Sequence, residues 1–137
     1  MCLINGAQLL DYQVHADSRG KLAAFEQFES LPFRLERVFL ISVDKSGTVR
    51  GGHANSCDEY IVALTGSVLV ELDNGHARCT VRIRPNGQAL WVRPGVLIIL
   101  RDFEPETRLL VCASARYEDT RHFDRPQPQL IEADCYA

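Results

Sequence analysis

The chain of 137 residues has the length of one domain, and its hydrophobic content of 46% is enough to bury an ordinary core. Its formal net charge is only -3 and it contains no run of Lys or Arg, which argues against nucleic acid and anionic membrane surfaces as partners. We therefore expect a single domain over residues 1–137 that binds neither of them.

Targeting and cysteine signals are weak. The N-terminal stretch MCLINGAQLLDYQ has no basic region ahead of its short apolar run, and no segment approaches the roughly 20 apolar residues of a membrane span. The five cysteines are scattered and never spaced as Cys-x-x-Cys, which argues against a disulfide framework and against a zinc knuckle. These features predict a cytoplasmic protein.

Short apolar and β-branched runs recur about every ten residues, between glycine, proline or acidic turns. They predict strands over residues 8–15, 22–27, 36–43, 51–54, 58–64, 67–73, 77–83, 89–93, 96–101 and 107–113. The alternation of Val68, Val70 and Leu72 is followed by Asn74-Gly75, a pair that supplies the positive φ of a tight hairpin.

Little of the chain has a helical pattern. Only residues 114–125 favour a helix, with acidic residues early and basic residues late, and the tail over 126–137 should be irregular because it has two prolines in its first three residues. Many short strands with almost no helix indicate an antiparallel sandwich or barrel of the jelly-roll kind. Such a fold keeps its site in the mouth or interior of the barrel.

The most informative segment surrounds His53. Side chains alternate along a strand, so His53 and Asn55 share one face with residue 51, while residues 50, 52 and 54 share the other. Glu59 and Gly66 complete the spacing His-x-Asn-x3-Glu-x6-Gly, which is the first cupin motif with its second histidine replaced by Asn55. The pair Gly51-Gly52 before it favours either a bulge or a simple turn.

The second cupin motif is also incomplete. Gly87 and Pro94-Gly95 stand at its glycine and turn positions, but the position of its histidine ligand falls near Ile98, within an apolar run. A cupin metal needs three or four converging nitrogen and oxygen ligands, and one strong ligand is missing from each motif. We therefore expect neither a metal nor another cofactor.

Six stretches of the chain extend this pattern beyond the two motifs. They are DSRGKLAAFE, LPFRLERVFLI, RGGHANSCDEYIVALTGSVLVELDNG, LWVRPGV, RDF and LLVCASARYED. In order and spacing, up to about residue 123, they resemble the nucleotide-sugar 3,4-ketoisomerases, metal-free cupins that convert a dTDP-4-keto-6-deoxyhexose into its 3-keto isomer. The resemblance implies an all-β cupin, a jelly roll or double-stranded β-helix with a short C-terminal helical turn. It also implies a homodimer that exchanges or pairs N-terminal strands.

The chain departs from the family at the site. The family pattern is Arg-Gly-x-His-Ala-His, and its two histidines are held to transfer the protons; here they are His53 and Asn55. The family usually has tyrosine where this chain has Phe39, and a Trp, then His or Arg, then Glu near the aliphatic residues 97–99. One interpretation is an isomerase in which His53 is the base and the Asn55 amide donates a hydrogen bond to the enediolate. The alternatives are a non-catalytic cupin that binds a nucleotide sugar, and a different isomerase or epimerase of a related keto-sugar.

Substrate-binding candidates follow from the chemistry of a nucleotide sugar. Guanidinium groups match phosphate oxygens, so Arg19 and Arg50 are candidates for the pyrophosphate, unless they are a solvated surface pair. Tyr60 or Trp91 could stack on the base, or equally belong to the barrel wall. Glu59 is either a residue of the active site or a carboxylate at a sheet edge, paired to an arginine.

Overall fold

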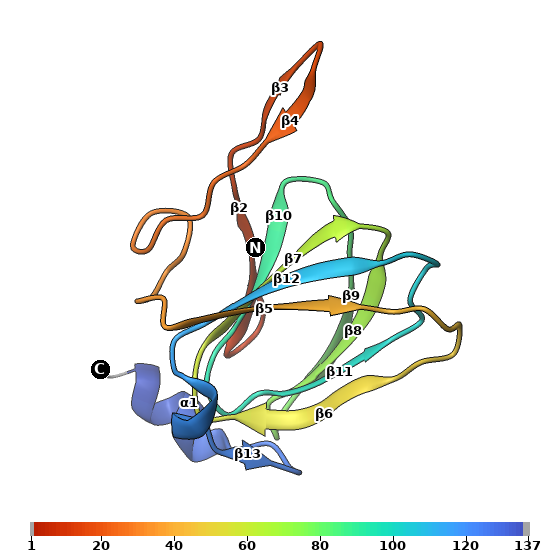
Figure 1. Cartoon of the computed structure of the whole chain (residues 1–137). Helices are drawn as coiled ribbons and strands as arrows, with labels where there is room; N and C mark the ends of the chain where they lie inside the picture. The colour runs from red at the N-terminus through yellow and green to blue at the C-terminus, as the bar shows by residue number, and fades with distance from the viewer. Residues whose placement is uncertain (1, 136–137) are drawn as a thin grey trace.

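A computed structural model describes residues 2–135 as two antiparallel β-sheets that face one another, with a β-hairpin extending from one end (Figure 1). The six-stranded sheet has the order β1-β2-β10-β7-β12-β5, the five-stranded sheet has the order β13-β6-β11-β8-β9, and β3-β4 is the hairpin. The strands are β1 Cys2–Ile4, β2 Ala7–Asp11, β3 His15–Asp17, β4 Gly20–Leu22, β5 Arg37–Ser42, β6 Arg50–Asn55, β7 Glu59–Thr65, β8 Val68–Asp73, β9 Arg78–Ile83, β10 Gln88–Val92, β11 Leu97–Arg101, β12 Arg108–Ala113 and β13 His122–Phe123.

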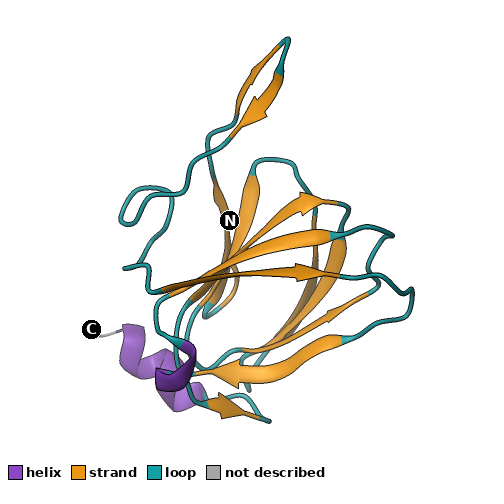
Figure 2. Ribbon diagram, in the orientation of Figure 1, coloured by secondary structure: helices purple, strands orange, loops and turns teal. Residues whose placement is uncertain are grey.

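The chain winds back and forth between the two sheets. Successive strands from β5 to β8 lie in alternate sheets, and so do those from β9 to β12. All the paired strands are antiparallel, which together with this winding gives the jelly roll of a cupin. The predicted all-β jelly roll is therefore confirmed, and the ribbon in Figure 2 shows how little helix accompanies it.

The core between the sheets follows the predicted alternation. Val68, Val70 and Leu72 of β8 are almost completely buried and point into the main apolar cluster. Burial of each such side chain stabilises the fold by about 1.5–3 kcal/mol. After β8 the chain turns at Gly75, which has a φ of +90°, while Asn74 Oδ1 accepts hydrogen bonds from the backbone N–H groups of residues 76 and 77. The predicted turn between these strands is confirmed.

Strand β7 is buried on both of its faces. Its residues Glu59 and Ile61 point between the sheets, and the alternate residue Tyr60 packs on the outer face of the six-stranded sheet. There Tyr60 meets Leu31 and Phe33, from the segment that precedes β5. A covering layer on this outer face explains why β7 is nearly all apolar, and it leaves Glu59 as a carboxyl inside the molecule.

The N-terminal strands differ from the prediction because the chain leaves the sheet. The strand expected over 8–15 ends at Asp11, and β3 then begins the projecting hairpin. The strand expected over 22–27 is wrong except at Leu22: β4 covers Gly20–Leu22, and of residues 23–27 only Gln27 forms a bridge, an isolated one to Leu31.

The C-terminal segment differs more. The helix predicted over 114–125 is only a 3₁₀ turn, η1 (Tyr117–Asp119), followed by β13. The tail predicted to be irregular forms helix α1 (Pro128–Cys135). Pro128 does not prevent this, because a proline in the first helical turn loses no intrahelical hydrogen bond. Ile131 of α1 is buried in the main apolar cluster, so the sheets hold this helix in place. No helix among the described residues is long and apolar enough to cross a membrane.

Candidate active site

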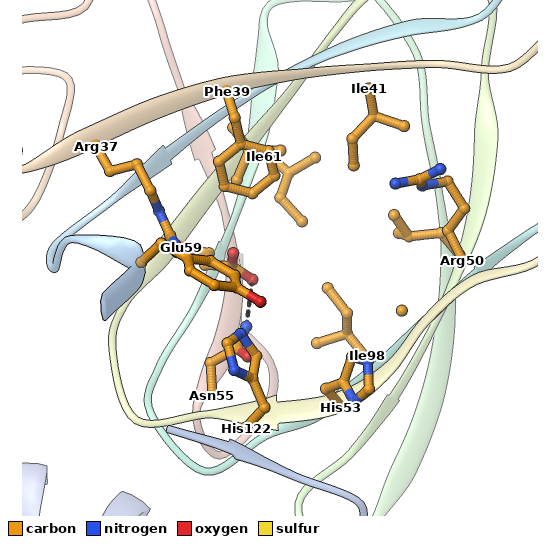
Figure 3. Close-up of a pocket in the computed structure, with 14 residues that line it drawn as sticks. Arg37, Phe39, Ile41, Arg50, His53, Asn55, Glu59, Ile61, Ile98 and His122 are labelled. Carbon is orange, nitrogen blue, oxygen red and sulfur yellow. Dashed lines mark hydrogen bonds between the residues drawn. The ribbon is translucent and has the colours of Figure 1, made fainter. Parts of the chain in front are cut away.

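A cavity of about 580 Å³ opens between the two sheets (Figure 3), within the usual range for small-molecule sites. Strands β5, β7 and β12 form one wall, and β6, β11 and β13 form the other. The lining residues are Arg37, Phe39, Ile41, Arg50, Gly51, His53, Asn55, Glu59, Ile61, Ile98, Leu100, Val111, Tyr117 and His122. The cavity is thus apolar at its base, with polar side chains converging from β5, β6, β7 and the C-terminal segment.

Strand β6 places His53 and Asn55 on the cavity side, as their spacing predicts. Of the two alternatives for Gly51-Gly52, the structure has the bulge: both glycines have a φ near +80°, and the pairing with β11 shifts register there. A Cβ at Gly51 would lie 2.8 Å from the Ile98 carbonyl oxygen, so the two strands approach as closely as only glycine allows. The bulge also turns Arg50 into the cavity, although simple alternation assigned it to the other face.

Asn55 and Glu59 form a hydrogen-bonded pair inside the cavity. Asn55 Nδ2 donates to Glu59 Oε1 at 2.8 Å, the bond drawn dashed in Figure 3. Glu59 is only 6% exposed. Burial raises the pKa of its carboxyl, although the positive charge of Arg37 and the bond from Asn55 act in the opposite direction. Asn55 Oδ1 is buried and has no hydrogen-bond partner among the described residues.

The structure adds three polar residues that the sequence pattern did not predict: Arg37, Tyr117 and His122. Arg37 lies on β5, where the guanidinium packs over the rings of Phe39 and Tyr117, with its carbon 5.2 and 5.6 Å from the ring centroids. His122 on β13 contacts Tyr117 on one side, at 5.4 Å between ring centroids, and His53 on the other. Alternation along β5 could have identified Arg37, since Arg37 and Phe39 share a face; no local signal identified His122.

Tyr60 and Trp91 do not reach the cavity, so their predicted stacking on a nucleotide base is not supported by this geometry. Both side chains belong to the second apolar cluster, on the outer face of the six-stranded sheet. They pair directly across β7 and β10, so they share that face. Trp91 Nε1 donates to Asp58 Oδ1 at 2.9 Å, and the guanidinium of Arg93 covers its ring. The alternative that these residues belong to the barrel wall describes them better.

Arg19 is also remote from the cavity of its own chain. It lies at the turn of the β3-β4 hairpin, where its guanidinium bonds Asp17 at 2.6 Å, and both side chains are exposed. Of the two arginines predicted to bind pyrophosphate, only Arg50 therefore lines the cavity, on the side opposite Arg37 (Figure 3).

The aliphatic residues at 97–99 are divided between two faces. Ile98 lines the cavity, whereas Leu97 and Ile99 lie in a groove on the outer face of the five-stranded sheet. Ile98 is paired directly with His53, so an apolar side chain borders the predicted base. Among the side chains that the structure describes, those of residues 3–131, no group of three or more His, Cys, Asp or Glu could hold a metal ion.

Residues 5–127 match the protein family described as FdtA: WxcM-like, C-terminal. The chain belongs to this family. The TDP-4-oxo-6-deoxy-alpha-D-glucose-3,4-oxoisomerase of Aneurinibacillus thermoaerophilus is 32% identical over 114 residues, which are 82% of each chain. The predicted resemblance to nucleotide-sugar 3,4-ketoisomerases is thereby confirmed for this FdtA-family chain.

Solved structures agree with the family assignment. A double mutant of the QdtA 3,4-ketoisomerase from Thermoanaerobacterium thermosaccharolyticum, in complex with TDP, superposes with a TM-score of 0.83 at 26% identity, over 90% of both chains. A single mutant of the same enzyme, in complex with TDP-4-keto-6-deoxyglucose, superposes with a TM-score of 0.84, over 96% of this chain and 95% of the other. Its 23% identity shows the shared fold only.

Proposed function

We propose that the protein is a 3,4-ketoisomerase that moves a ketone between C4 and C3 of a dTDP-4-keto-6-deoxyhexose. The observation that carries this proposal is the histidine at position 53, on a cavity wall, in a chain 32% identical to a TDP-4-oxo-6-deoxyglucose 3,4-oxoisomerase. The size of the cavity suits a hexose with part of its nucleotide.

The reaction needs a base that can also act as an acid. The proton at C3 is acidic because it is next to the C4 ketone, and its removal gives an enediol that regains a proton at C4. His53 is proposed to carry out both steps, since an imidazole can accept a proton and return it. Arg37 lies across the cavity with a positive charge that stabilises an enediolate. Asn55 is proposed to contact a sugar oxygen with its amide.

Arg50 is proposed to bind the diphosphate. Its guanidinium is exposed on the cavity side opposite Arg37, so the diphosphate would lie at one side and the hexose beside His53 and Asn55. Glu59 is proposed to hold the Asn55 amide rather than to bind substrate directly, because its carboxyl is buried.

A homodimer is proposed as the working state. The edge strand β5 exposes Val38 and Leu40 on its outer face, at 52% and 68%, and such a patch of apolar side chains is typical of an interface. The β3-β4 hairpin extends away from its own sheets (Figure 1), and in a dimer it is proposed to carry Arg19 toward the substrate of the partner subunit. Sedimentation of wild type and Leu40→Glu tests this assembly: the wild type should be a dimer and the variant a monomer.

Proton NMR in deuterium oxide with dTDP-4-keto-6-deoxyglucose tests the activity. The expected result is loss of the C3 proton signal together with the appearance of a 3-keto product. His53→Asn should abolish both, whereas the same substitution at His76, on the turn between β8 and β9, should change neither. Absence of both events in the wild type, with substrate binding confirmed by calorimetry, would leave the alternative of a cupin that only holds the sugar.

A further inference from the structure

His122 occupies the position directly opposite Asn55. Strand β13 pairs antiparallel with β6, and His122 is the register partner of Asn55. The ring of His122 lies 5.8 Å from the ring of His53, centroid to centroid, at an interplanar angle of 72°. Both rings line the cavity from adjacent strands (Figure 3). The cavity therefore contains two imidazoles, although only one comes from the His-x-Asn motif.

The proposed isomerisation must move two protons. One is the C–H proton, which leaves C3 and returns at C4, and His53 accounts for it. The other is a hydroxyl proton: the C3 hydroxyl loses it as the new C3 ketone forms, and the old C4 carbonyl oxygen gains it. No oxidant or reductant is needed, because the substrate redistributes its own electrons. A second group must therefore accept a proton from one oxygen and donate one to the other.

The residues around His53 differ in their ability to do this. The Asn55 amide cannot take up a proton at neutral pH, and one of its N–H groups is already bound to Glu59. Glu59 is buried beneath that amide. A neutral imidazole has a donor N–H and an acceptor nitrogen in one ring, so it can pass a proton from oxygen to oxygen. His122 is exposed to the cavity and contacts Tyr117 on its other side, which holds the ring.

We propose that His122 is the second proton-transfer residue of this protein, and that it carries the hydroxyl proton from the C3 oxygen to the C4 oxygen. This inference rests on the proposed ketoisomerase function. In this assignment the second histidine of the site lies on β13, and the position of β6 that pairs with it holds Asn55.

The test compares two rates measured in one NMR experiment with dTDP-4-keto-6-deoxyglucose in deuterium oxide. These are exchange of the C3 proton, which requires His53, and formation of the 3-keto product, which requires both transfers. Without His122, the intermediate returns to substrate more often than it goes forward. His122→Gln should therefore lower product formation by about 100-fold and raise the ratio of exchange to product at least about tenfold. The matched control His76→Gln should leave both rates unchanged.

A relocation variant separates proton transfer from a structural role. In Asn55→His/His122→Asn the imidazole moves to the register partner on β6, and product formation should recover at least about tenfold over His122→Asn alone. Thermal unfolding and TDP binding, measured for every variant, identify any that is misfolded. Exchange and product falling in parallel in His122→Gln, or no change in either, would overturn the assignment while leaving the isomerase intact. A wild type without exchange or product would overturn the proposed function itself.

Discussion

Asn55→Leu should destabilise the protein by about 1.5–3 kcal/mol at neutral pH, because it removes the hydrogen bond that the buried carboxyl group of Glu59 accepts and leaves that group without it. The bond in question runs from Asn55 Nδ2 to Glu59 Oε1, at 2.8 Å. Leucine has nearly the shape of asparagine, so the substitution changes the bond more than the packing. For a chain of this length, the loss corresponds to a decrease of about 6–12 °C in the unfolding temperature.

The loss should depend on pH. The hydrogen bond lowers the pKa of Glu59 against the larger effect of burial, which raises it. Without Asn55 the pKa rises further, so ionising Glu59 in the folded state costs more and the variant loses more stability as pH increases. At about pH 4 the carboxyl is largely protonated in both folded and unfolded chains, and the loss should fall to about 1 kcal/mol, the value of a neutral hydrogen bond.

Circular dichroism of thermal and urea unfolding measures these differences in a double-mutant cycle. The four proteins are wild type, Asn55→Leu, Glu59→Gln and the double variant, each at pH 4 and pH 8. The cost of Asn55→Leu at pH 8 should be about 0.5–2 kcal/mol smaller when Glu59→Gln is already present, because the bond to the glutamine is a neutral one. An equal cost in both backgrounds, or no dependence on pH, would show that Asn55 stabilises the fold by packing alone.

Three further changes test other parts of the structure. Because the pKa of Glu59 is raised, the folded chain holds a proton that the unfolded chain releases. The wild type should therefore lose stability as pH rises above about 4.3, and Glu59→Gln should not. Unfolding temperatures measured against pH compare the two proteins. Gly66→Ala should cost more than about 2 kcal/mol in urea unfolding, because φ is +72° and the new Cβ collides with Thr107 Oγ1. Gly47→Ala, with φ at +81° and open space around it, should show the backbone cost alone. Ile131→Ala should cost about 2–5 kcal/mol by the same assay, and no loss would mean that α1 does not stabilise the sheets.

Local pattern determined most of the sheet structure. Alternation along β8, the turn at Gly75 and the face shared by His53 and Asn55 depend on neighbours close in sequence, and each was predicted correctly. The family resemblance, confirmed over residues 5–127, depends on the same local motifs. The same motif lies on β6, which lines the cavity.

The tertiary structure decided which side chains meet. Tyr60 faces outward because residues before β5 cover that side of β7, and Arg50 faces inward because two glycines form a bulge. The alternation of side chains along a strand predicts neither orientation. It divides the residues between two faces but does not show which face lies in the interior.

His122 shows the same limit most clearly. The sequence alone established one histidine in a His-x-Asn motif, on a strand of an all-β fold. Only the pairing of β13 with β6 brought a second imidazole to that motif, through backbone hydrogen bonds between segments far apart in the chain. Such pairing depends on how the whole chain closes around its core, so a residue's own neighbours carry no signal of it.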